Sequence, residues 1–545
     1  MTDGEVPVWR QKFDVERVKA EGVEPDLARL EREGFASLTP EEYYRLKTVG
    51  VCSQRTPGLH MIRIRVPGGR VTAVQVRGLR RLSWSVADGG AHITTRQNLE
   101  LHSVPSTLVR RALDELEALG LSTRSSCGHT VRNIVGCTRA GICPDEQFDV
   151  SATVQDLHRF FLDRAAYYNA RLPRRLNVYV AGCSGCMSHA QVNDLGFVAV
   201  RHAGGDGFQL WCAGSLGSNP RLAHLLFRFV PADEVVAVAE AVADVYCEHG
   251  FRERAAKARL KFLLAEWGEE RFVEAVLERL AEIRPDARTV RTVRTGPAPA
   301  LGPDRRLPGH TRGVFAQKQP GFVRIEARVP LGDLDRDQLT TLEVLADRYA
   351  DGTVWLTREQ NAELHWVRQE DAEAVTAVLR AARLWPDGAG GLVDVQVCAG
   401  TEYCIWGVGD SRGLARDLDA TLSSIAAMDP PSARPLRVHI SGCSHGCAQH
   451  QTADVGLAAV SVRDGDRGIS EGFELFGGGR LGADPAAASR LGKVPAHVAP
   501  EKLVALLARF VAERQDAETF AEFIERVDAR ALVALEPAPT TGGAS

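Results

Sequence analysis

The chain has 545 residues, of which 44% are hydrophobic and 25% charged. This is the usage of a globular protein, and the length suggests several packed domains. A formal net charge of −4 disfavours a general nucleic-acid binder, since such proteins carry a basic excess. No stretch approaches the roughly 18 apolar residues of a membrane span, and the charged N-terminal segment lacks a signal-peptide core. We therefore expect a cytoplasmic protein that binds neither nucleic acid nor membrane.

The first expected element is a helical segment over residues 1–50. In it Thr39, Pro40 and Glu42 match an N-cap, a first-turn proline and a capping-box glutamate. The pattern then predicts strands over 61–69, 71–77 and around the TTRQ run, and a helix over 103–121 capped by Ser106. The remaining predictions are strands at 176–183, 193–200, 436–443 and 453–460, and helices at 231–250 and 500–515.

The chain contains two copies of one unit. Cys137 and Cys398 are 261 residues apart, as are Cys143 and Cys404. TTRQNLELH recurs as LTREQNAELH, MIRIRVPGG is echoed by FVRIEARVPLG, and NDLGFVAV by ADVGLAAV, at similar offsets. Because several motifs keep one spacing, we interpret the chain as an internal duplication.

Each copy is expected to be an α+β unit, with a small strand–helix part before the first cysteine pair and a larger part around the pairs. The predicted divisions are a helical segment (1–50), a small domain (51–125), a large domain (126–285), a Pro/Gly/Arg-rich linker (286–310), a second small domain (311–388), a second large domain (389–535) and a disordered tail (536–545).

Twelve cysteines require an explanation in a cytoplasmic chain, where disulfides are rare. Eight of them form four tight pairs, which indicates metal binding or catalysis. In the second half the pattern is C-x5-C…C-x3-C, formed by Cys398, Cys404, Cys443 and Cys447. Four thiolates are the usual ligands of a 4Fe–4S cluster. A zinc site is the alternative, but zinc knuckles favour shorter gaps.

This cysteine pattern, the earlier TTRQ run and the duplicated layout resemble the sulfite/nitrite reductase family, over about residues 51–527. The resemblance implies two pseudo-symmetric halves, each with a ferredoxin-like unit and a larger mixed α/β unit. It implies that Cys398, Cys404, Cys443 and Cys447 hold a 4Fe–4S cluster, and that Cys447 also bridges to the iron of sirohaem. The implied reaction is six-electron reduction of nitrite to ammonia or of sulfite to sulfide.

The resemblance also implies roles for polar residues in the first half. The substrate would contact Arg63, Arg132, Arg175 and Asn177, and sirohaem would contact Thr94, Thr95, Arg96, Gln97 and Arg174. Sirohaem carries many carboxylates, and the arginine fork binds carboxylates while keeping its charge.

Two of these positions depart from many relatives. Arg175 stands where they have lysine, which weakens proton delivery there, because arginine holds its proton. Asn177 replaces the second lysine of sulfite reductases and is similar to the nitrite-reductase branch, so it favours nitrite.

In the common family pattern the first half has lost its cluster cysteines, but here it retains four. Cys137, Cys143, Cys183 and Cys186 lie in register with the second-half set, with one gap shortened to x2. We predict a second iron–sulfur cluster there without a second haem. The alternative is a metal-free relic of the duplication.

The chain has no dinucleotide-binding or Walker motif, so FAD and NADPH are not expected on it. Electrons should come from ferredoxin or a flavoprotein. Within the superfamily the alternatives are a precorrin-modifying oxygenase and a dissimilatory-type sulfite reductase. From another class, the alternative is a non-catalytic, metal-stabilised binding protein.

Overall fold

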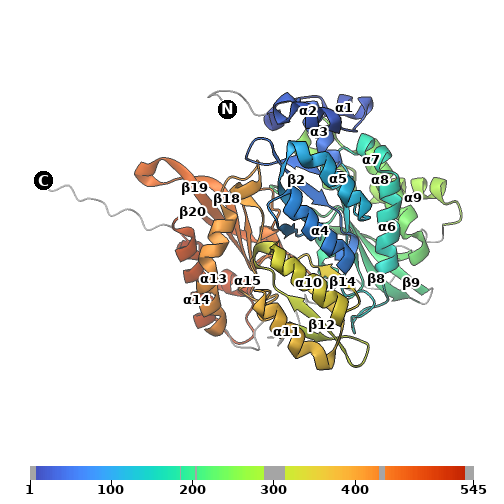
Figure 1. Cartoon of the computed structure of the whole chain (residues 1–545). Coiled ribbons are helices and arrows are strands. Elements are labelled where there is room, and N and C mark those ends of the chain that lie inside the picture. The colour runs from blue at the N-terminus through green and yellow to red at the C-terminus, as the bar shows by residue number, and fades with distance from the viewer. Residues whose placement is uncertain (1–7, 184–185, 203–204, 288–312, 429–435, 534–545) are drawn as a thin grey trace. The chain divides into compact units, whose positions relative to one another are not determined.

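A computed structural model describes residues 8–183, 186–202, 205–287, 313–428, 436–533 of the chain. The predicted tail and nearly all of the predicted linker lie outside these ranges. The fold divides into two compact units, Met1–Ala389 with Leu481–Asp484, and Gly390–Arg480 with Pro485–Ser545. Each unit is described separately below, with the element labels of Figure 1.

Unit 1 begins with helices α1 (Val15–Glu21), α2 (Leu27–Glu33) and α3 (Pro40–Thr48). The predicted capping box is confirmed. Thr39 Oγ1 accepts from the backbone N–H of Glu42, and the Glu42 carboxylate accepts from the Thr39 N–H. The backbone N–H groups of Thr39 and Glu42 thereby both have hydrogen-bond acceptors, which fixes where α3 starts.

Two small ferredoxin-like modules follow in unit 1 and share one hydrophobic core. The elements of the first are β1 (Val51–Ser53), β2 (Leu59–Ile64), β3 (Arg70–Thr72), α4 (Ala73–Val86), β4 (Ala91–Ile93), β5 (Leu99–Pro105) and α5 (Val109–Ala118). Those of the second are β11 (Val314–Ala316), β12 (Phe322–Ala327), β13 (Asp333–Leu334), α10 (Arg336–Tyr349), β14 (Thr353–Leu356), β15 (Ala362–Arg368) and α11 (Ala372–Ala381).

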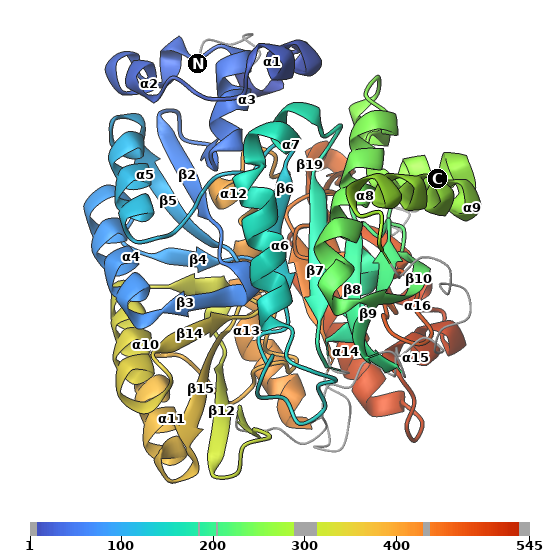
Figure 2. The ribbon, with the colours of Figure 1, turned by 90° about the vertical axis from the view of Figure 1, so that its right-hand side faces the viewer.

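The two small modules exchange a strand. Strand β3 pairs with β14, and β13 pairs with β4, so each sheet is completed by the other copy. Helices α4 and α10 pack side by side over this arrangement (Figure 2). Gly69 allows the close approach, because a Cβ there would lie 2.1 Å from the Leu356 carbonyl oxygen.

Three local predictions are wrong in this region. Residues 73–77 begin α4, because Thr72 and Gln75 form a capping box that starts a helix. The TTRQ run is the turn between β4 and β5, with Gln97 at a φ of +56°. Ser106 does not cap α5; its hydroxyl bonds the His60 ring at 2.8 Å.

The large domain of unit 1 has a five-stranded sheet of order β10-β9-β8-β7-β6. Strands β6, β7 and β8 are parallel, and the others are antiparallel. Its elements are β6 (Val131–Gly136), α6 (Ser151–Asp163), α7 (Ala165–Arg171), β7 (Leu176–Ala181), β8 (Leu195–His202), β9 (Gly205–Cys212), β10 (His224–Pro231), α8 (Val235–His249) and α9 (Leu260–Ile283).

Unit 2 repeats that sheet, in the order β16-β17-β18-β19-β20 with the same mixture of parallel and antiparallel pairs. Its elements are β16 (Gln396–Val397), α12 (Gly400–Tyr403), α13 (Ser411–Met428), β17 (Val438–Ser441), β18 (Val455–Arg463), β19 (Ile469–Gly477), β20 (Ser489–Pro495), α14 (Ala499–Glu513), α15 (Phe520–Arg526) and α16 (Ala529–Val533). The duplicated α+β fold is confirmed, and in each sheet the first two parallel strands, β6 and β7 or β16 and β17, lead into a cysteine loop.

Candidate functional site

Two arginines with a predicted substrate role converge on one loop of unit 1. Arg63, on β2, donates from Nε to Glu100 Oε1 at 2.7 Å and from Nη1 to the sulfur of Cys127 at 2.9 Å. Arg132, on β6, donates to the Ser126 carbonyl, which Arg63 approaches at 3.5 Å. Strand β2 and strand β6 thus bring two cations to residues 126–127.

Two arginines with a predicted cofactor role lie in turns. Arg96, between β4 and β5, donates to Asn193 Oδ1 at 3.1 Å and to the Asn133 carbonyl at 3.3 Å. Arg174 lies just before β7, with its Nη1 2.7 Å from His129 Nε2. Both side chains are held by the large domain.

The remaining turn residues with a predicted role differ in what they contact. Thr94 Oγ1 accepts from the backbone of Arg96 and Asn98, and therefore holds the turn that presents Arg96. Thr95 lies in the same turn. Gln97 makes two hydrogen bonds to the backbone of Gly136, at 3.0 and 2.9 Å. Its amide docks the turn on the end of β6.

Asn177 and Arg175 lie at the start of β7. Asn177 is buried, and its backbone N–H donates to Asp194 Oδ2 at 2.8 Å. Asp194 is neutralised by Arg259, at 2.8 Å. Burial, followed by the charge of Arg259, lowers the pKa of Lys261 to about 8, and Arg175 also contributes to this shift.

This arginine cluster suits a large anionic ligand. Burial and the charge of Arg132 lower the pKa of Arg96 to about 9, and burial lowers that of Arg132 to about 10. Within the described residues, the Nε atoms of Arg96 and Arg132 and Nδ1 of His129 are buried without a hydrogen-bond partner. Buried cations without counter-charge are costly, so several carboxylates here would be strongly bound. The residues therefore fit sirohaem.

Sequence reasoning missed several members of this cluster. Lys47, His129 and Lys261 interact electrostatically with its arginines, and burial lowers the pKa of each. Cys127 is buried and accepts a hydrogen bond from Arg63. A hydrogen bond with Cys52 is the largest of the effects that lower its pKa to about 5. No local motif marks these residues, and of them only Lys261 lies in a basic run, KARLK at 257–261.

The four first-half cysteines converge. Cys137 follows β6 and Cys183 follows β7, and their sulfurs are 3.6 Å apart. Cys186 Sγ lies 3.4 Å from Cys183 Sγ, and the three sulfurs all lie within 4.8 Å of one another. The Cys143 thiol hydrogen-bonds Cys183, which lowers the pKa of Cys143.

The four second-half cysteines lie on equivalent loops of unit 2 but are more widely spaced. Among the described residues they form no group of three sulfurs within 4.8 Å. Cys398 Sγ accepts from the Gly442 N–H at 3.0 Å, and Cys443 Sγ lies 3.4 Å from His445 Nδ1. Burial raises the pKa of Cys443 to about 11, and the charges of Cys398 and Cys404 add to this. Cys447 is exposed.

Glycine makes this thiol arrangement sterically feasible. Gly400 has a φ of +50°, and a Cβ on Gly442 would lie 2.6 Å from the Gly400 Cα. The loops after β16 and β17 therefore touch backbone to backbone. Thiols spread around such loops fit four separate irons of a cluster, each taking one thiolate.

Known families match most of the chain. The model of the nitrite and sulphite reductase 4Fe-4S domain matches residues 127–283 and 388–534. The model of the nitrite/sulfite reductase ferredoxin-like half domain matches 53–119 and 315–382.

Relatives span nearly the whole length. A ferredoxin–nitrite reductase of Synechococcus elongatus is 32% identical over 522 residues, covering 93% of this chain and 97% of that protein. A ferredoxin sulfite reductase of Mycolicibacterium paratuberculosis is 30% identical, covering 92% and 91%. The Mycobacterium tuberculosis NirA structure gives a TM-score of 0.84 at 26% identity, covering 96% and 98%. As the duplication and the cysteine pattern predict, the chain belongs to the nitrite and sulphite reductase family of oxidoreductases, with 4Fe–4S domains.

Proposed function

We propose that this enzyme reduces nitrite to ammonia, a six-electron reaction, with electrons from ferredoxin. The observation that carries the proposal is the buried arginine cluster, in a chain similar along 93% of its length to a ferredoxin–nitrite reductase. Sulfite is the second candidate substrate, because a similarly close relative is a ferredoxin sulfite reductase.

Two sets of residues would hold the cofactors. Arg96 and Arg174 would pair with carboxylates of sirohaem, and the Thr94 hydroxyl orders the turn that carries Arg96. The thiolates of Cys398, Cys404, Cys443 and Cys447 would bind the 4Fe–4S cluster, with Cys447 shared with the sirohaem iron. When bound, the coupled pair supplies electrons singly to the substrate.

The remaining polar side chains would hold the substrate anion and its protons. Arg63 and Arg132 offer fixed donors that stabilise charge developing on oxygen as the N–O or S–O bond breaks. Arg175 keeps its proton, so it binds without delivering one. Lys261 has a pKa of about 8 and can both bind the anion and exchange a proton near neutral pH.

Asn177 is our reason for placing nitrite before sulfite. An amide adds no charge, whereas a lysine at this position would add a cation for the more highly charged sulfite. The Asn177 side chain is buried at the start of β7, so it cannot reach far to compensate. The site thus offers one fewer cation to a dianion.

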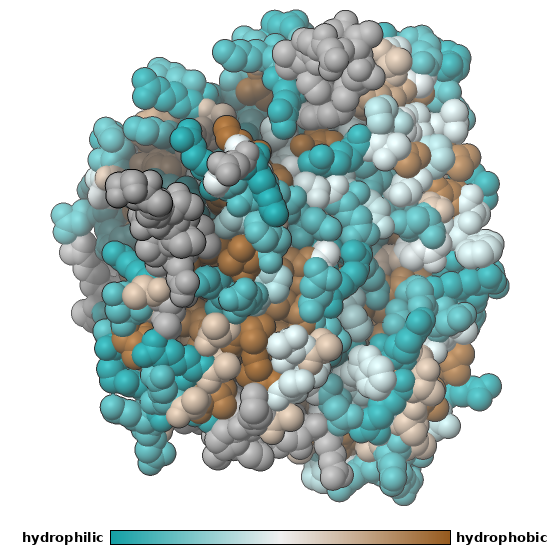
Figure 3. All heavy atoms as spheres, turned by 90° about the vertical axis from the view of Figure 1, so that its left-hand side faces the viewer, coloured by the Kyte–Doolittle hydropathy of each residue, from teal (hydrophilic) through white to brown (hydrophobic). Residues whose placement is uncertain are grey.

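We also infer a cytoplasmic location. None of the twelve cysteines, all of which lie in the described ranges, forms a disulfide, as expected in a reducing compartment. None of the helices in the described ranges is both long and apolar enough to cross a bilayer. Hydrophilic side chains predominate on the face drawn in Figure 3, with small apolar groups between them.

The test is turnover of the purified holoenzyme with one reduced ferredoxin and either anion. We expect ammonia from nitrite, with six ferredoxins oxidised for each nitrite consumed, and a lower kcat/KM with sulfite. A higher kcat/KM with sulfite would reverse the assignment. No turnover of either anion, in a sample with the absorption of sirohaem, would refute it.

A further inference from the structure

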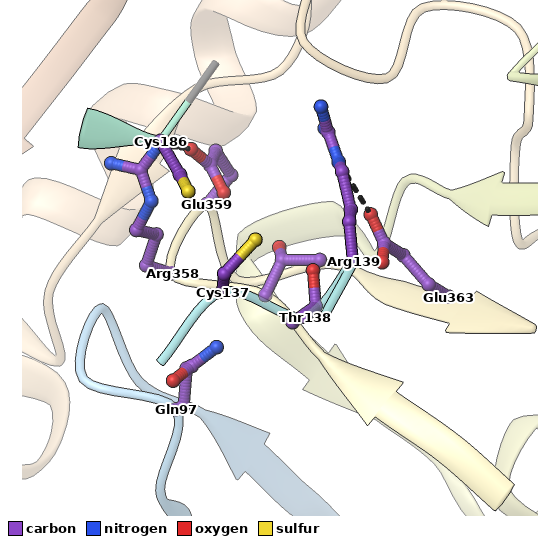
Figure 4. Close-up of a pocket in the computed structure, with 9 residues that line it drawn as sticks. Gln97, Cys137, Thr138, Arg139, Cys186, Arg358, Glu359 and Glu363 are labelled. Carbon is purple, nitrogen blue, oxygen red and sulfur yellow. Dashed lines mark ion pairs between the residues drawn. The ribbon is translucent and has the colours of Figure 1, made fainter. Parts of the chain in front are cut away.

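Three first-half cysteines, Cys137, Cys183 and Cys186, form a compact group of sulfurs at the carboxyl ends of two adjacent parallel strands, and Cys143 adjoins this group through its hydrogen bond to Cys183. Cys137 follows β6, Cys183 follows β7, and Cys186 and Cys143 complete the set from the two loops. Figure 4 shows the Cys137 and Cys186 thiols directed toward a common space. Cys137, Cys183 and Cys186 are buried, and Cys143 is partly buried.

The spacing of the sulfurs matches one metal ion. A tetrahedral ion with metal–sulfur bonds of about 2.3 Å has sulfur–sulfur edges of about 3.8 Å. The observed separations of 3.6 and 3.4 Å are close to that edge. In a four-iron cluster each thiolate binds a different iron, so the sulfurs stand farther apart. Among the described residues, the second-half cysteines form no group of three sulfurs within 4.8 Å of one another.

We propose that Cys137, Cys143, Cys183 and Cys186 bind one zinc ion as a structural site. This differs from the second four-iron cluster that the sequence predicts, and it is independent of the proposed reductase function. Four thiolates and one divalent ion leave a net charge of −2. Binding releases the thiol protons and involves no change of oxidation state.

Two arginines lie beside the set. Arg139 and Arg358 line the same small cavity as Cys137 and Cys186. The Arg358 charge contributes to lowering the pKa of the Cys186 thiol, after the hydrogen bonds from Cys137 and Cys183. Both arginines are also paired with glutamates, Arg139 with Glu363 at 3.8 Å and Arg358 with Glu359 at 3.1 Å, so these side chains together are close to neutral.

The same cavity is unsuited to a second sirohaem. Glu359 and Glu363 also line it, and Arg139 is already paired with Glu363 at 3.8 Å (Figure 4). Carboxylates beside the cysteines would repel the many carboxylates of a macrocycle. A single ion with four thiolates carries far less negative charge than sirohaem with its many carboxylates, so the same glutamates repel it less.

The ion would fasten the loop between β6 and α6. That loop also contacts the second small module, where the Lys318 N–H donates to the Ile142 carbonyl at 2.9 Å and Gln319 Nε2 to the Gly141 carbonyl at 2.8 Å. A closed four-thiolate site would hold the loop in the position that these contacts need.

Metal analysis of the purified holoenzyme tests the proposal without any variant. We expect one zinc per chain in addition to the irons of one cluster and one sirohaem. One extra iron per chain without extra acid-labile sulfide would mean that the four cysteines bind a single ion but that this ion is iron and not zinc. Four extra irons with matching sulfide, or no extra metal with the four thiols oxidised or free, would overturn the proposal.

Variants then assign the metal to its ligands. Cys183→Ala should lose the zinc, retain the sirohaem spectrum and cluster iron, and lower the Tm by several degrees. Cys212→Ala is the matched control, since Cys212 is equally buried in the same domain and belongs to neither set, and should keep the zinc. Cys443→Ala should do the reverse, losing cluster iron but keeping zinc. Zinc retained in Cys183→Ala would refute the assignment, and the wild-type count remains decisive if a variant does not fold.

Discussion

The two small modules of unit 1 have the same strands but carry opposite charges at equivalent positions. Strand pairing sets Arg63 opposite Glu100 in the first module. In the second, the same pairing sets Glu326 opposite Glu363. Two like charges facing each other across strands are destabilising. They are neutralised here by Arg324, at 3.0 Å from Glu326 and 2.6 Å from Glu363.

A second reversal of charge occurs between the two equivalent turns, one after β4 and one after β14. Residues 94–98 and 357–361 close with the same backbone hydrogen bonds, so Arg96 is equivalent to Glu359. Gln97 and Gln360 both have a positive φ, which confirms the register.

This difference separates a binding surface from a structural one. The first module leaves arginines in excess of acids, which is unfavourable until an anion binds. The second module balances its charges internally and lies beside the compact cysteine set. Under the proposed function, one backbone serves ligand binding in the first copy and internal packing in the second, and two positions that are Arg in the first copy and Glu in the second distinguish them.

The largest expected effect comes from Cys447→Ser. If this thiolate serves both the cluster and the sirohaem iron, both chromophores should be lost and turnover should fall to background. Cys186→Ser, at the equivalent first-half position, should keep both. The visible spectrum and iron content of the two variants measure this. An unchanged spectrum and normal turnover in Cys447→Ser would remove the bridging assignment.

Arg132→Ala should lower kcat by about 10²- to 10³-fold with cofactor content nearly intact, because one fixed donor to developing charge is lost. Arg159→Ala is the control, since that arginine lies exposed on α6 of the same domain, and should leave turnover unchanged. Steady-state kinetics with reduced ferredoxin measure both. Activity within a few-fold of wild type would place Arg132 away from the substrate.

Exchanging the charges of the two modules tests the comparison directly. Arg63→Glu should lower turnover by about 10²-fold, because an acid replaces a cation at the anion site. Glu326→Arg should keep turnover but lower the free energy of unfolding by about 3 kcal/mol, because buried Arg324 loses a partner. Kinetics and denaturant titration separate the two effects. Equal loss of activity in both variants would contradict the division of roles.

Asn177→Lys should shift the ratio of kcat/KM values toward sulfite by about tenfold, by adding a cation for the dianion. Asn177→Gln is the control, since it keeps an uncharged amide and should not move the ratio toward sulfite. If both variants change the ratio equally, size and not charge sets the preference at this position.

The sequence allowed the duplication, the strand-end cysteines and the α3 capping box to be predicted, because each depends on local patterns. The strand exchange between the small modules was not predictable, since it is a tertiary pairing of segments more than 240 residues apart. The runs MIRIRVPGG and FVRIEARVPLG differ in length, so the sequence alone left the equivalence of Arg63 with Glu326 undetermined, and the strand register reveals it. Lys261 and His129 could not be found because no motif marks a cation whose role depends on its neighbours.

The smallest expected effect concerns Lys261. Its pKa is lowered from 10.5 to about 8, so the side chain is protonated below pH 8 and loses its charge as the pH rises through that value. We therefore expect kcat/KM to fall a few-fold above pH 8, because the anion loses one partner. Lys261→Arg should abolish this decline, since arginine stays protonated, whereas exposed Lys257→Arg should not. The unfolded chain binds more protons than the folded chain between about pH 8 and 10.5, so wild-type stability should rise over that window. A decline that persists in Lys261→Arg would assign it to another group.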